Sequence, residues 1–228
     1  MPSWPPQDTE PGVPTFLAIE SSTSHASLVV MSEGEILFEG GCVSDRHHNS
    51  LLFEPLQEAI GALGERRIDE VIVGTGPGSY SGTRVGIAAG QGVAMVHDCP
   101  AVGLSSLLAT DFGEATAIGD ARRGSAWTAK VKSPELPDPQ LLPMGDLAGA
   151  LSGSDKIFTF EEPDRFGLPK DLVVEQVVPT ARLLIEAWTR LSDARREELR
   201  ALPPQPAYLK PPHITEAKKG HPLLRGKK

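Results

Sequence analysis

A glycine-rich stretch, placed between a short apolar run and a helical pattern, constrains this chain more than any other feature. The residues Gly74–Gly86 read GTGPGSYSGTRVG and hold five glycines. Glycine tolerates positive φ and close backbone approach, and the first turn of a helix directs free N–H groups toward such a loop. The pattern predicts a strand–loop–helix unit that can bind an anion, and a tight turn with a flat packing face is the open alternative.

The same stretch matches neither a standard phosphate-binding motif nor a nucleophile elbow. It contains no lysine, so it lacks G-x-x-x-x-G-K-[ST], and Ser79 interrupts G-x-G-x-x-G after Gly74 and Gly76. Tyr80 holds the centre of G-S-Y-S-G, where a nucleophile elbow needs serine. We therefore predict no catalytic residue here, and no other serine is singled out as activated.

Apolar runs and helical patterns alternate along the chain and predict an α/β fold. The runs expected to be strands are Thr15–Ser21, Ala26–Met31, Glu35–Val43, Val71–Val73, Ala101–Gly103, Ala115–Gly119, Ser125–Val131 and Lys156–Phe160. The helical patterns are His48–Leu63, Thr83–His97 and Thr180–Leu191, with Thr180 as a cap for the last. Pro134–Pro143 is expected to be a connection, and Asp193–Leu202 to extend or follow the last helix.

The chain divides into four parts by composition and pattern. Residues 1–14 include five prolines and are expected to be a disordered leader, whereas 15–104 form a first α/β unit and 105–202 a smaller second one. Residues 203–228 form a basic tail with six Lys or Arg and one acid, although the whole chain has a net charge of −8. A solvated tail and a tail that contacts RNA or an acidic surface both remain open.

Several classes of site are disfavoured by the residues that the sequence lacks. Cys42 and Cys99 lie far apart, which excludes a disulfide scaffold or a cysteine zinc site. No histidine has another four residues away, so a helical H-x-x-x-H metal site is absent and no metal is predicted. No apolar run approaches the roughly 20 residues that span a bilayer. We therefore expect a cytoplasmic protein with no membrane partner.

Two short segments carry further candidate site residues. Glu20 and Ser21 follow an apolar strand, where an acid either serves a metal–phosphate site or is an ordinary exposed turn residue. Asp120 and Arg122 lie in a turn between two predicted strands. Arg122 can pair with Asp120, with a phosphate, or across a cleft, and an ordinary surface ion pair is the simplest interpretation.

Several segments together resemble the bacterial tRNA threonylcarbamoyladenosine biosynthesis protein TsaB family, also called YeaZ. The segments are LAIESSTSHASLVV (17–30), GTGPGSYSGTRVGIAAGQGVA (74–94), VGLSSL (102–107), GDARRGSAW (119–127) and the near-terminal PAYLK (206–210). The resemblance implies a two-lobed actin/Hsp70/sugar-kinase-like (ribonuclease H-like) fold with mixed sheets flanked by helices. Glu20 stands where that family usually has aspartate, and Ser21 where glycine would let a phosphate approach. Glu20, Ser21, Gly76, Gly78 and Ser79 are then a vestigial phosphate site, and this chain binds no cofactor tightly.

The resemblance also implies a function and partners. The chain would be a non-catalytic subunit that dimerises with the catalytic paralogue TsaD and works with the ATPase TsaE, while the complex uses ATP and Mg²⁺ and binds the tRNA. A homodimer is a further implied assembly. The implied interface residues, on two first-lobe helices, are Leu52, Leu56, Ile60, Gly82, Arg84, Gly86, Ala89, Gly90 and Val93. The alternative is an actin-like-fold nucleotide hydrolase or small-molecule kinase that uses Glu20 and the 74–82 loop; a glycoprotease is disfavoured by the missing histidine pair.

Overall fold

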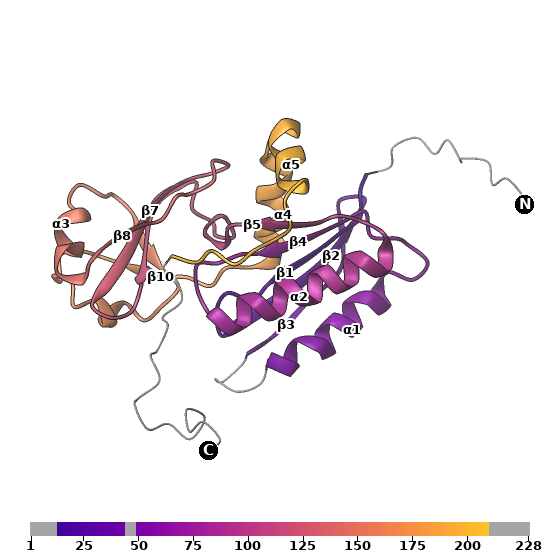
Figure 1. Ribbon diagram of the computed structural model, residues 1–228, viewed down its shortest axis with the longest axis horizontal. Helices are drawn as coiled ribbons and strands as arrows, with labels where there is room; N and C mark the ends of the chain where they lie inside the picture. Colours follow the sequence, from indigo (N-terminus) through magenta and orange to yellow (C-terminus); the bar gives the residue numbers. More distant parts are fainter. Residues whose placement is uncertain (1–12, 44–48, 210–228) are drawn as a thin grey trace, which may run out of the picture.

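Two mixed five-stranded sheets form the framework of the molecule (Figure 1). The computed structural model describes residues 13–43 and 49–209. The first sheet contains β1 (Phe16–Glu20), β2 (His25–Ser32), β3 (Glu35–Val43), β4 (Glu70–Gly74) and β5 (Ala101–Leu104). The second contains β6 (Glu114–Asp120), β7 (Ser125–Lys132), β8 (Gln140–Pro143), β9 (Ile157–Thr159) and β10 (Glu175–Gln176). The predicted α/β fold with mixed sheets flanked by helices is confirmed.

The two sheets repeat one topology. The first has the order β3-β2-β1-β4-β5, and the second has the order β8-β7-β6-β9-β10 when read from its opposite edge. In each sheet the first three strands form an antiparallel meander, and the first strand then pairs in parallel with the fourth. The fifth strand pairs in parallel with the fourth in both. The β1–β2 turn and the β6–β7 turn therefore occupy equivalent places in the two lobes.

Helices cover both faces of the first sheet (Figure 1). On one face α1 (Phe53–Ala62) and α2 (Tyr80–His97) lie side by side, and α4 (Ala181–Arg190) packs on the other face. The alternation of β1 explains this arrangement, because successive side chains of a strand point to opposite faces. Leu17 and Ile19 pack with the α1–α2 layer, whereas Phe16 and Ala18 pack with α4. Among the described residues, none of the helices has the length and apolar character that a membrane span requires.

The ends of α1, α2 and α4 follow from local chemistry. Asn49–Leu52 forms a 3-10 turn ahead of α1, so this helix begins later than the predicted residue 48, which lies outside the described residues. Helix α2 begins at Tyr80, three residues before the predicted start, because the Ser79 side chain accepts a hydrogen bond from the Gly82 N–H. The predicted cap of α4 is confirmed, since the Thr180 side chain accepts from the Leu183 N–H.

Part of the expected connection Pro134–Pro143 is a strand. Residues Gln140–Pro143 pair antiparallel with the start of β7 as edge strand β8. Pro143 lacks an N–H, and an edge position at a strand end tolerates that loss. The prediction of a connection over residues 140–143 was therefore wrong, because the cross-strand pairing that forms β8 is not visible in a proline-rich local sequence.

The C-terminal helices return to the first sheet. Residues 181–200, assigned from the sequence to the second unit, form α4 and α5 (Asp193–Arg200), which contact β1, β2, β4 and β5. Trp188 and Leu184 of α4 are buried in a core that also includes Phe158 of the second sheet. One continuous core therefore joins the two lobes. Residues 1–12 of the predicted leader and 210–228 of the predicted tail lie outside the described residues.

Replacing two glycines of α2 with alanine is expected to change the free energy of unfolding in opposite directions. A Cβ at Gly90 would lie 2.4 Å from Cγ1 of Val73, whereas nothing lies within 4 Å of a Cβ at Gly92. We expect Gly92→Ala to raise the free energy of unfolding by about 0.5–1 kcal/mol, because alanine is the better helix former. Gly90→Ala is expected to lower it by about 1 kcal/mol, since overpacking outweighs the same gain. Urea titrations of the pair check this, and an equal gain in both variants would contradict the inward orientation of Gly90.

Candidate functional site

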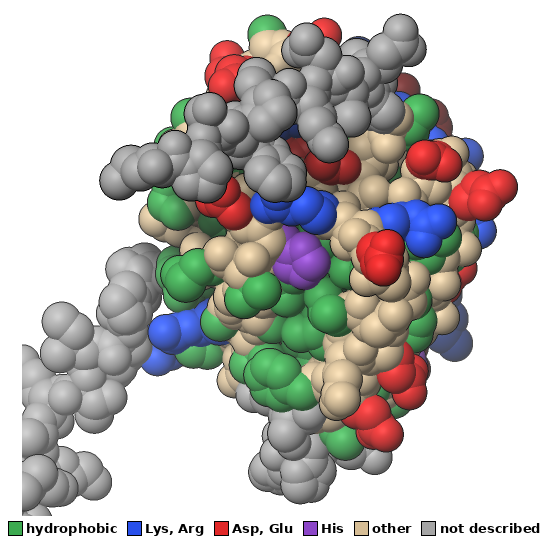
Figure 2. All heavy atoms as spheres, turned by 90° about the vertical axis from the view of Figure 1, so that its right-hand side faces the viewer, with side chains coloured by type: hydrophobic (Ala, Val, Ile, Leu, Met, Phe, Trp, Pro, Cys, Tyr) green, Lys and Arg blue, Asp and Glu red, His purple; other side chains and the backbone are tan. Residues whose placement is uncertain are grey.

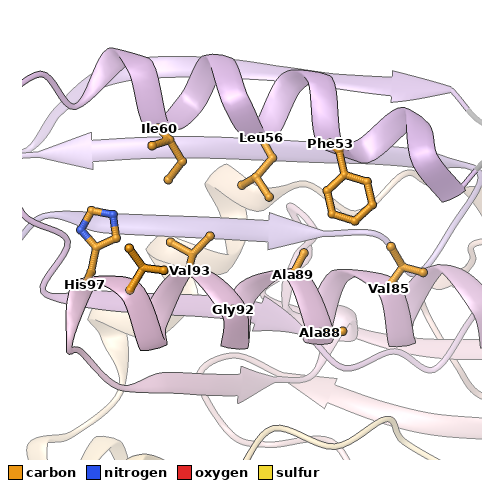
Figure 3. Close-up of a pocket in the computed structure, with 10 residues that line it drawn as sticks. Phe53, Leu56, Ile60, Val85, Ala88, Ala89, Gly92, Val93 and His97 are labelled. Atoms are coloured by element: carbon orange, nitrogen blue, oxygen red, sulfur yellow. The ribbon is translucent and has the colours of Figure 1, made fainter.

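An apolar groove runs between α1 and α2 and is the first candidate site (Figure 3). It has a volume of about 660 Å³. The residues that line it are Phe53, Leu56, Ile60, Val85, Ala88, Ala89, Gly92, Val93, Val96 and His97. Phe53, Leu56 and Ile60 extend from α1 toward α2, and Val93 extends from α2 toward α1. Apart from His97, no lining side chain is polar, so the groove offers hydrophobic contact rather than chemistry.

Much of the apolar surface at this groove is in contact with solvent. Val96 is 83% exposed and Phe53 is 55% exposed, and the neighbouring Met95 is 84% exposed. Figure 2 shows hydrophobic side chains gathered around a histidine on the face that lies to the right in Figure 1. Contiguous exposed apolar surface is typical of a protein-interaction site. Binding of a partner removes this surface from water, and that removal favours association.

The structure brings together some of the residues predicted for the interface. Leu56, Ile60, Ala89 and Val93 line the groove. Leu52 does not, since its side chain is buried with 3% exposure.

The prediction that the glycines at positions 82, 86 and 90 form a docking face needs correction. A Cβ at Gly86 would lie 2.1 Å from the Ser21 hydroxyl, and one at Gly82 would lie 2.3 Å from the Ser21 carbonyl oxygen. Gly90 faces Val73 in the same way. These three glycines let α2 approach the β1 strand end and β4 closely, so they serve internal packing and do not face the groove.

Six groove residues were not predicted for the interface from the sequence: Phe53, Val85, Ala88, Gly92, Val96 and His97. A signal for the α2 members was present, because Val85, Ala89, Gly92 and Val96 recur at spacings of four, three and four along the helix. That row is offset by one position from the glycine row on which the prediction relied. Arg84, which was predicted for the interface, instead lies over the ring of Tyr80 at the start of α2.

A polar cleft of about 650 Å³ lies between the equivalent hairpin turns of the two lobes. Ser22, Thr23 and Ser24 of the β1–β2 turn contribute to one wall, and residues 120–122 of the β6–β7 turn contribute to the other. Asp120 accepts hydrogen bonds from Arg122 at 3.0 Å and from Arg165 at 3.1 Å. The predicted pairing of Asp120 with Arg122 is thus present, and the Asp120 carboxylate is held by two guanidinium groups at the mouth of the cleft.

Several backbone donors of the glycine-rich loop bond within the protein itself. The Gly76 N–H donates to Oγ of Ser106 at 2.9 Å, and the Ser79 N–H donates to the Ser22 carbonyl oxygen. The Gly82 N–H donates to the Ser79 hydroxyl at 3.2 Å. A phosphate-binding loop needs such N–H groups free to surround the anion. The geometry therefore fits a tight structural turn better than a phosphate grip.

Glu20 is buried beneath this loop and is not an exposed turn residue. Its Oε1 accepts from the Ser22 N–H at 2.7 Å, and its side chain has no solvent exposure. A Cβ at Gly74 would lie 2.0 Å from Glu20 Oε2, so only glycine leaves room for the carboxyl group. Among the described residues, Oε2 finds no hydrogen-bond partner. Burial raises the pKa of Glu20, although hydrogen bonds from Ser22 partly oppose that rise.

Replacing Glu20 with glutamine is expected to flatten the dependence of stability on pH. Because the folded-state pKa of Glu20 is raised, its contribution to stability is fully present below the ordinary carboxyl value of 4.5 and is lost as pH rises through the raised pKa. Glu20→Gln should therefore unfold at higher denaturant than the parent chain near pH 8, by about 1 kcal/mol. The advantage should vanish near pH 4. A constant difference across this range, measured by urea titration, would contradict a raised pKa.

Across residues 13–43 and 49–209, no three His, Cys, Asp or Glu side chains come close enough together to hold a metal ion. The Oε2 atom of Glu20, which has no hydrogen-bond partner among the described residues, does not form one binding site with the two arginines that pair with Asp120. The cleft lies between the two equivalent hairpin turns, and its described residues include no such three-residue cluster.

The repeated sheet topology, with a cleft between the two equivalent hairpins, defines an actin-like (ribonuclease H-like) two-lobed fold. A family model described as TsaD, tRNA N6-adenosine threonylcarbamoyltransferase, matches residues 39–129, which include both helices of the groove. The chain is therefore similar to TsaB/YeaZ-type proteins, in agreement with the resemblance of its motifs.

Individual relatives support this placement. The tRNA threonylcarbamoyladenosine biosynthesis protein TsaB of Haemophilus influenzae is 32% identical over 97 residues, which are 42% of this chain and 41% of that protein. The TsaB protein of Escherichia coli is 28% identical over 132 residues, which are 53% of this chain and 56% of that protein. The chain spans about half the length of the curated relatives it matches. The structure of YeaZ from Pseudomonas aeruginosa shares the fold, with a TM-score of 0.64 at 22% identity over 86% of this chain and all of that one.

Proposed function

We propose that this chain is a non-catalytic partner subunit for threonylcarbamoyladenosine modification of tRNA. The observation that carries the proposal is the exposed apolar groove between α1 and α2, which the described residues leave uncovered. The relatives are named for threonylcarbamoyladenosine biosynthesis, and we therefore propose a partner that acts in that process. Because the substrate of that process is tRNA, we propose that the chain works in the cytoplasm.

The proposed occupant of the groove is a TsaD-like catalytic paralogue. A family model for TsaD matches the part of this chain that contains α1 and α2, so a TsaD-like protein would carry an equivalent helix pair. Two such pairs can pack across an approximate two-fold axis into a four-helix layer, with Ala88, Ala89 and Gly92 allowing the helices to approach closely. A second copy of this chain would use the same groove and would therefore compete with the paralogue.

The loop and Glu20 favour a subunit without its own phosphate chemistry. The N–H groups of Gly76, Ser79 and Gly82 bond within the protein, and Glu20 is buried beneath the loop. We therefore assign the ATP and Mg²⁺ of the complex to a TsaE-like ATPase and to the paralogue, with no cofactor held tightly by this chain. The alternative of an independent hydrolase or kinase gains no support from these contacts.

Reconstitution of tRNA modification tests the proposal. The catalytic paralogue, the ATPase and unmodified tRNA are incubated with and without this chain, and the modified nucleoside is measured by mass spectrometry. We expect modification only when the chain is present, together with co-purification of the chain and the paralogue. Equal modification without the chain would refute the proposal. So would turnover of Mg-ATP by the isolated chain that disappears in Glu20→Ala.

A further inference from the structure

The last described residues form a strap that brings a second tyrosine to the start of α2. After α5, the chain runs between the two lobes (yellow in Figure 1). Pro204 is buried against Gly103, where an added Cβ would lie 3.1 Å from the Pro204 Cβ. The Ala207 N–H then donates to the Thr75 carbonyl oxygen at 2.8 Å. These contacts fix the strap against the glycine-rich loop, and Tyr208 comes to lie beside Tyr80.

The two tyrosines form an exposed aromatic pair with an arginine beside it. Their ring centroids are 5.9 Å apart at an interplanar angle of 41°. Tyr80 is 61% exposed and Tyr208 is 56% exposed, so the pair buries little surface for folding. The Arg84 guanidinium lies 5.1 Å from the Tyr80 ring centroid and donates a hydrogen bond to its hydroxyl. This contact orients the Tyr80 ring while leaving ring surface open to solvent.

The pair stands at the polar cleft and not at the apolar groove. Tyr80 and Leu209 line the cleft, which also includes two arginines, Arg122 and Arg165, and three acids, Asp120, Glu161 and Glu162. The groove between α1 and α2 has none of these residues in its lining. In the sequence, all six Lys or Arg and the one acid of the 203–228 tail lie after Leu209, in residues 210–228. The exposed rings thus lie beside a polar cleft with charges of both signs, and the next residues in the sequence are the basic segment 210–228.

We propose that Tyr80 and Tyr208 form a stacking surface for unpaired RNA bases. Tyrosine rings stack on any base, and cationic side chains that follow the phosphates add affinity that depends on salt. RNA fits better than a protein partner because the surface is polar, and because the adjoining segment is basic in an otherwise acidic chain. The identification of this RNA as tRNA rests on the proposed function. The stacking surface itself is inferred independently of that function.

Binding of a short fluorescent oligouridylate to the full chain, followed by anisotropy, tests the stacking surface without any partner protein. We expect the double variant Tyr80→Ala and Tyr208→Ala to bind at least about fivefold more weakly than the parent chain. The double variant Tyr80→Phe and Tyr208→Phe should keep parental affinity, because phenylalanine preserves the ring. A duplex of the same length should bind more weakly than the single strand, since its bases are already stacked.

Phe53→Ala is the matched control, because Phe53 is an aromatic residue of similar exposure, 55%, that lies in the groove. It should leave oligouridylate binding unchanged while weakening capture of the catalytic paralogue. The alanine pair at 80 and 208 should do the reverse, so failure of the proposed function and failure of this inference give different results. No binding by the parent chain, or equal binding by the parent and the alanine pair, would overturn the stacking surface. Loss of paralogue capture in that pair, with RNA binding intact, would assign the tyrosines to a protein partner instead.

Discussion

Placing a glutamate at Ala88 is expected to weaken association with the catalytic paralogue by at least about 100-fold, or about 3 kcal/mol. Ala88 lines the groove on α2 and is exposed, so the longer side chain fits the isolated subunit without a clash. Docking would transfer its carboxylate from water into an apolar contact with no cation in the groove lining to receive it. Burying an unpaired charge costs several kcal/mol, and this cost appears only in the complex.

Ala194→Glu provides the matched control for this experiment. Ala194 is also an exposed alanine in a helix, and the substitution adds the same charge to α5 away from the groove. Isothermal titration with the purified paralogue should give parental affinity for Ala194→Glu and a large loss for Ala88→Glu, with both variants unfolding at the parental temperature. Modification of tRNA in the reconstituted system should fall with Ala88→Glu alone. Similar affinities for the two variants would show that the paralogue docks elsewhere.

Removing the carboxylate of Glu70 is expected to produce the largest loss of stability, roughly 3 kcal/mol. Glu70, at the start of β4, is 3% exposed. Its Oε2 accepts from the Trp188 indole N–H at 2.7 Å, and its Oε1 accepts from Arg200 Nε at 2.7 Å. Arg200 also lies 5.5 Å from the Trp188 ring centroid. Glu70→Ala leaves the buried indole N–H without its acceptor and the guanidinium without its partner, so α4 and α5 lose a shared attachment to the first sheet.

Glu186→Ala is the comparison that isolates the effect of burial. Glu186 of α4 pairs with Arg190 at 3.0 Å, but both side chains are partly exposed, so a loss of only a few tenths of a kcal/mol is expected. Urea titrations of Glu70→Ala, Arg200→Ala and the double variant complete the test. The double variant should lose less than the sum of the two single losses, since each single change removes the same interaction. Additive losses would mean that Glu70 acts through packing and not through Arg200.

Local chemistry made several elements predictable. The strand–loop–helix unit around Gly74–Gly86 was recognisable because glycine and a helix start have strong local preferences. Thr180 was identified as a cap for the same reason. Periodicity indicated the α/β class, whereas the two-lobed actin-like fold was predicted only through the resemblance carried by the loop and the Asp120–Arg122 turn. The residues that line the groove were predicted less well. Periodicity locates the faces of a helix but does not show which face packs on the helix's own sheet.

The α2 helix shows this limit clearly. Small residues occur on two of its faces, at Gly86 and Gly90 and again at Ala88 and Gly92. The four-residue spacing is the same in both rows. Only contact with Val73 and Ser21 shows that the first row is internal, and only the open space at Gly92 shows that the second borders the groove.

The sequence alone determined what short-range interactions control: the α/β class, the glycine turn, the cap at Thr180, and the absence of a helical histidine pair. The tertiary structure alone decided the repeated sheet topology, the burial of Glu20, the return of α4 and α5 to the first sheet, and the meeting of Tyr80 with Tyr208. Each of these brings together residues far apart in the chain. Pairing between strands and burial of side chains depend on such distant neighbours, whose identity no local pattern encodes.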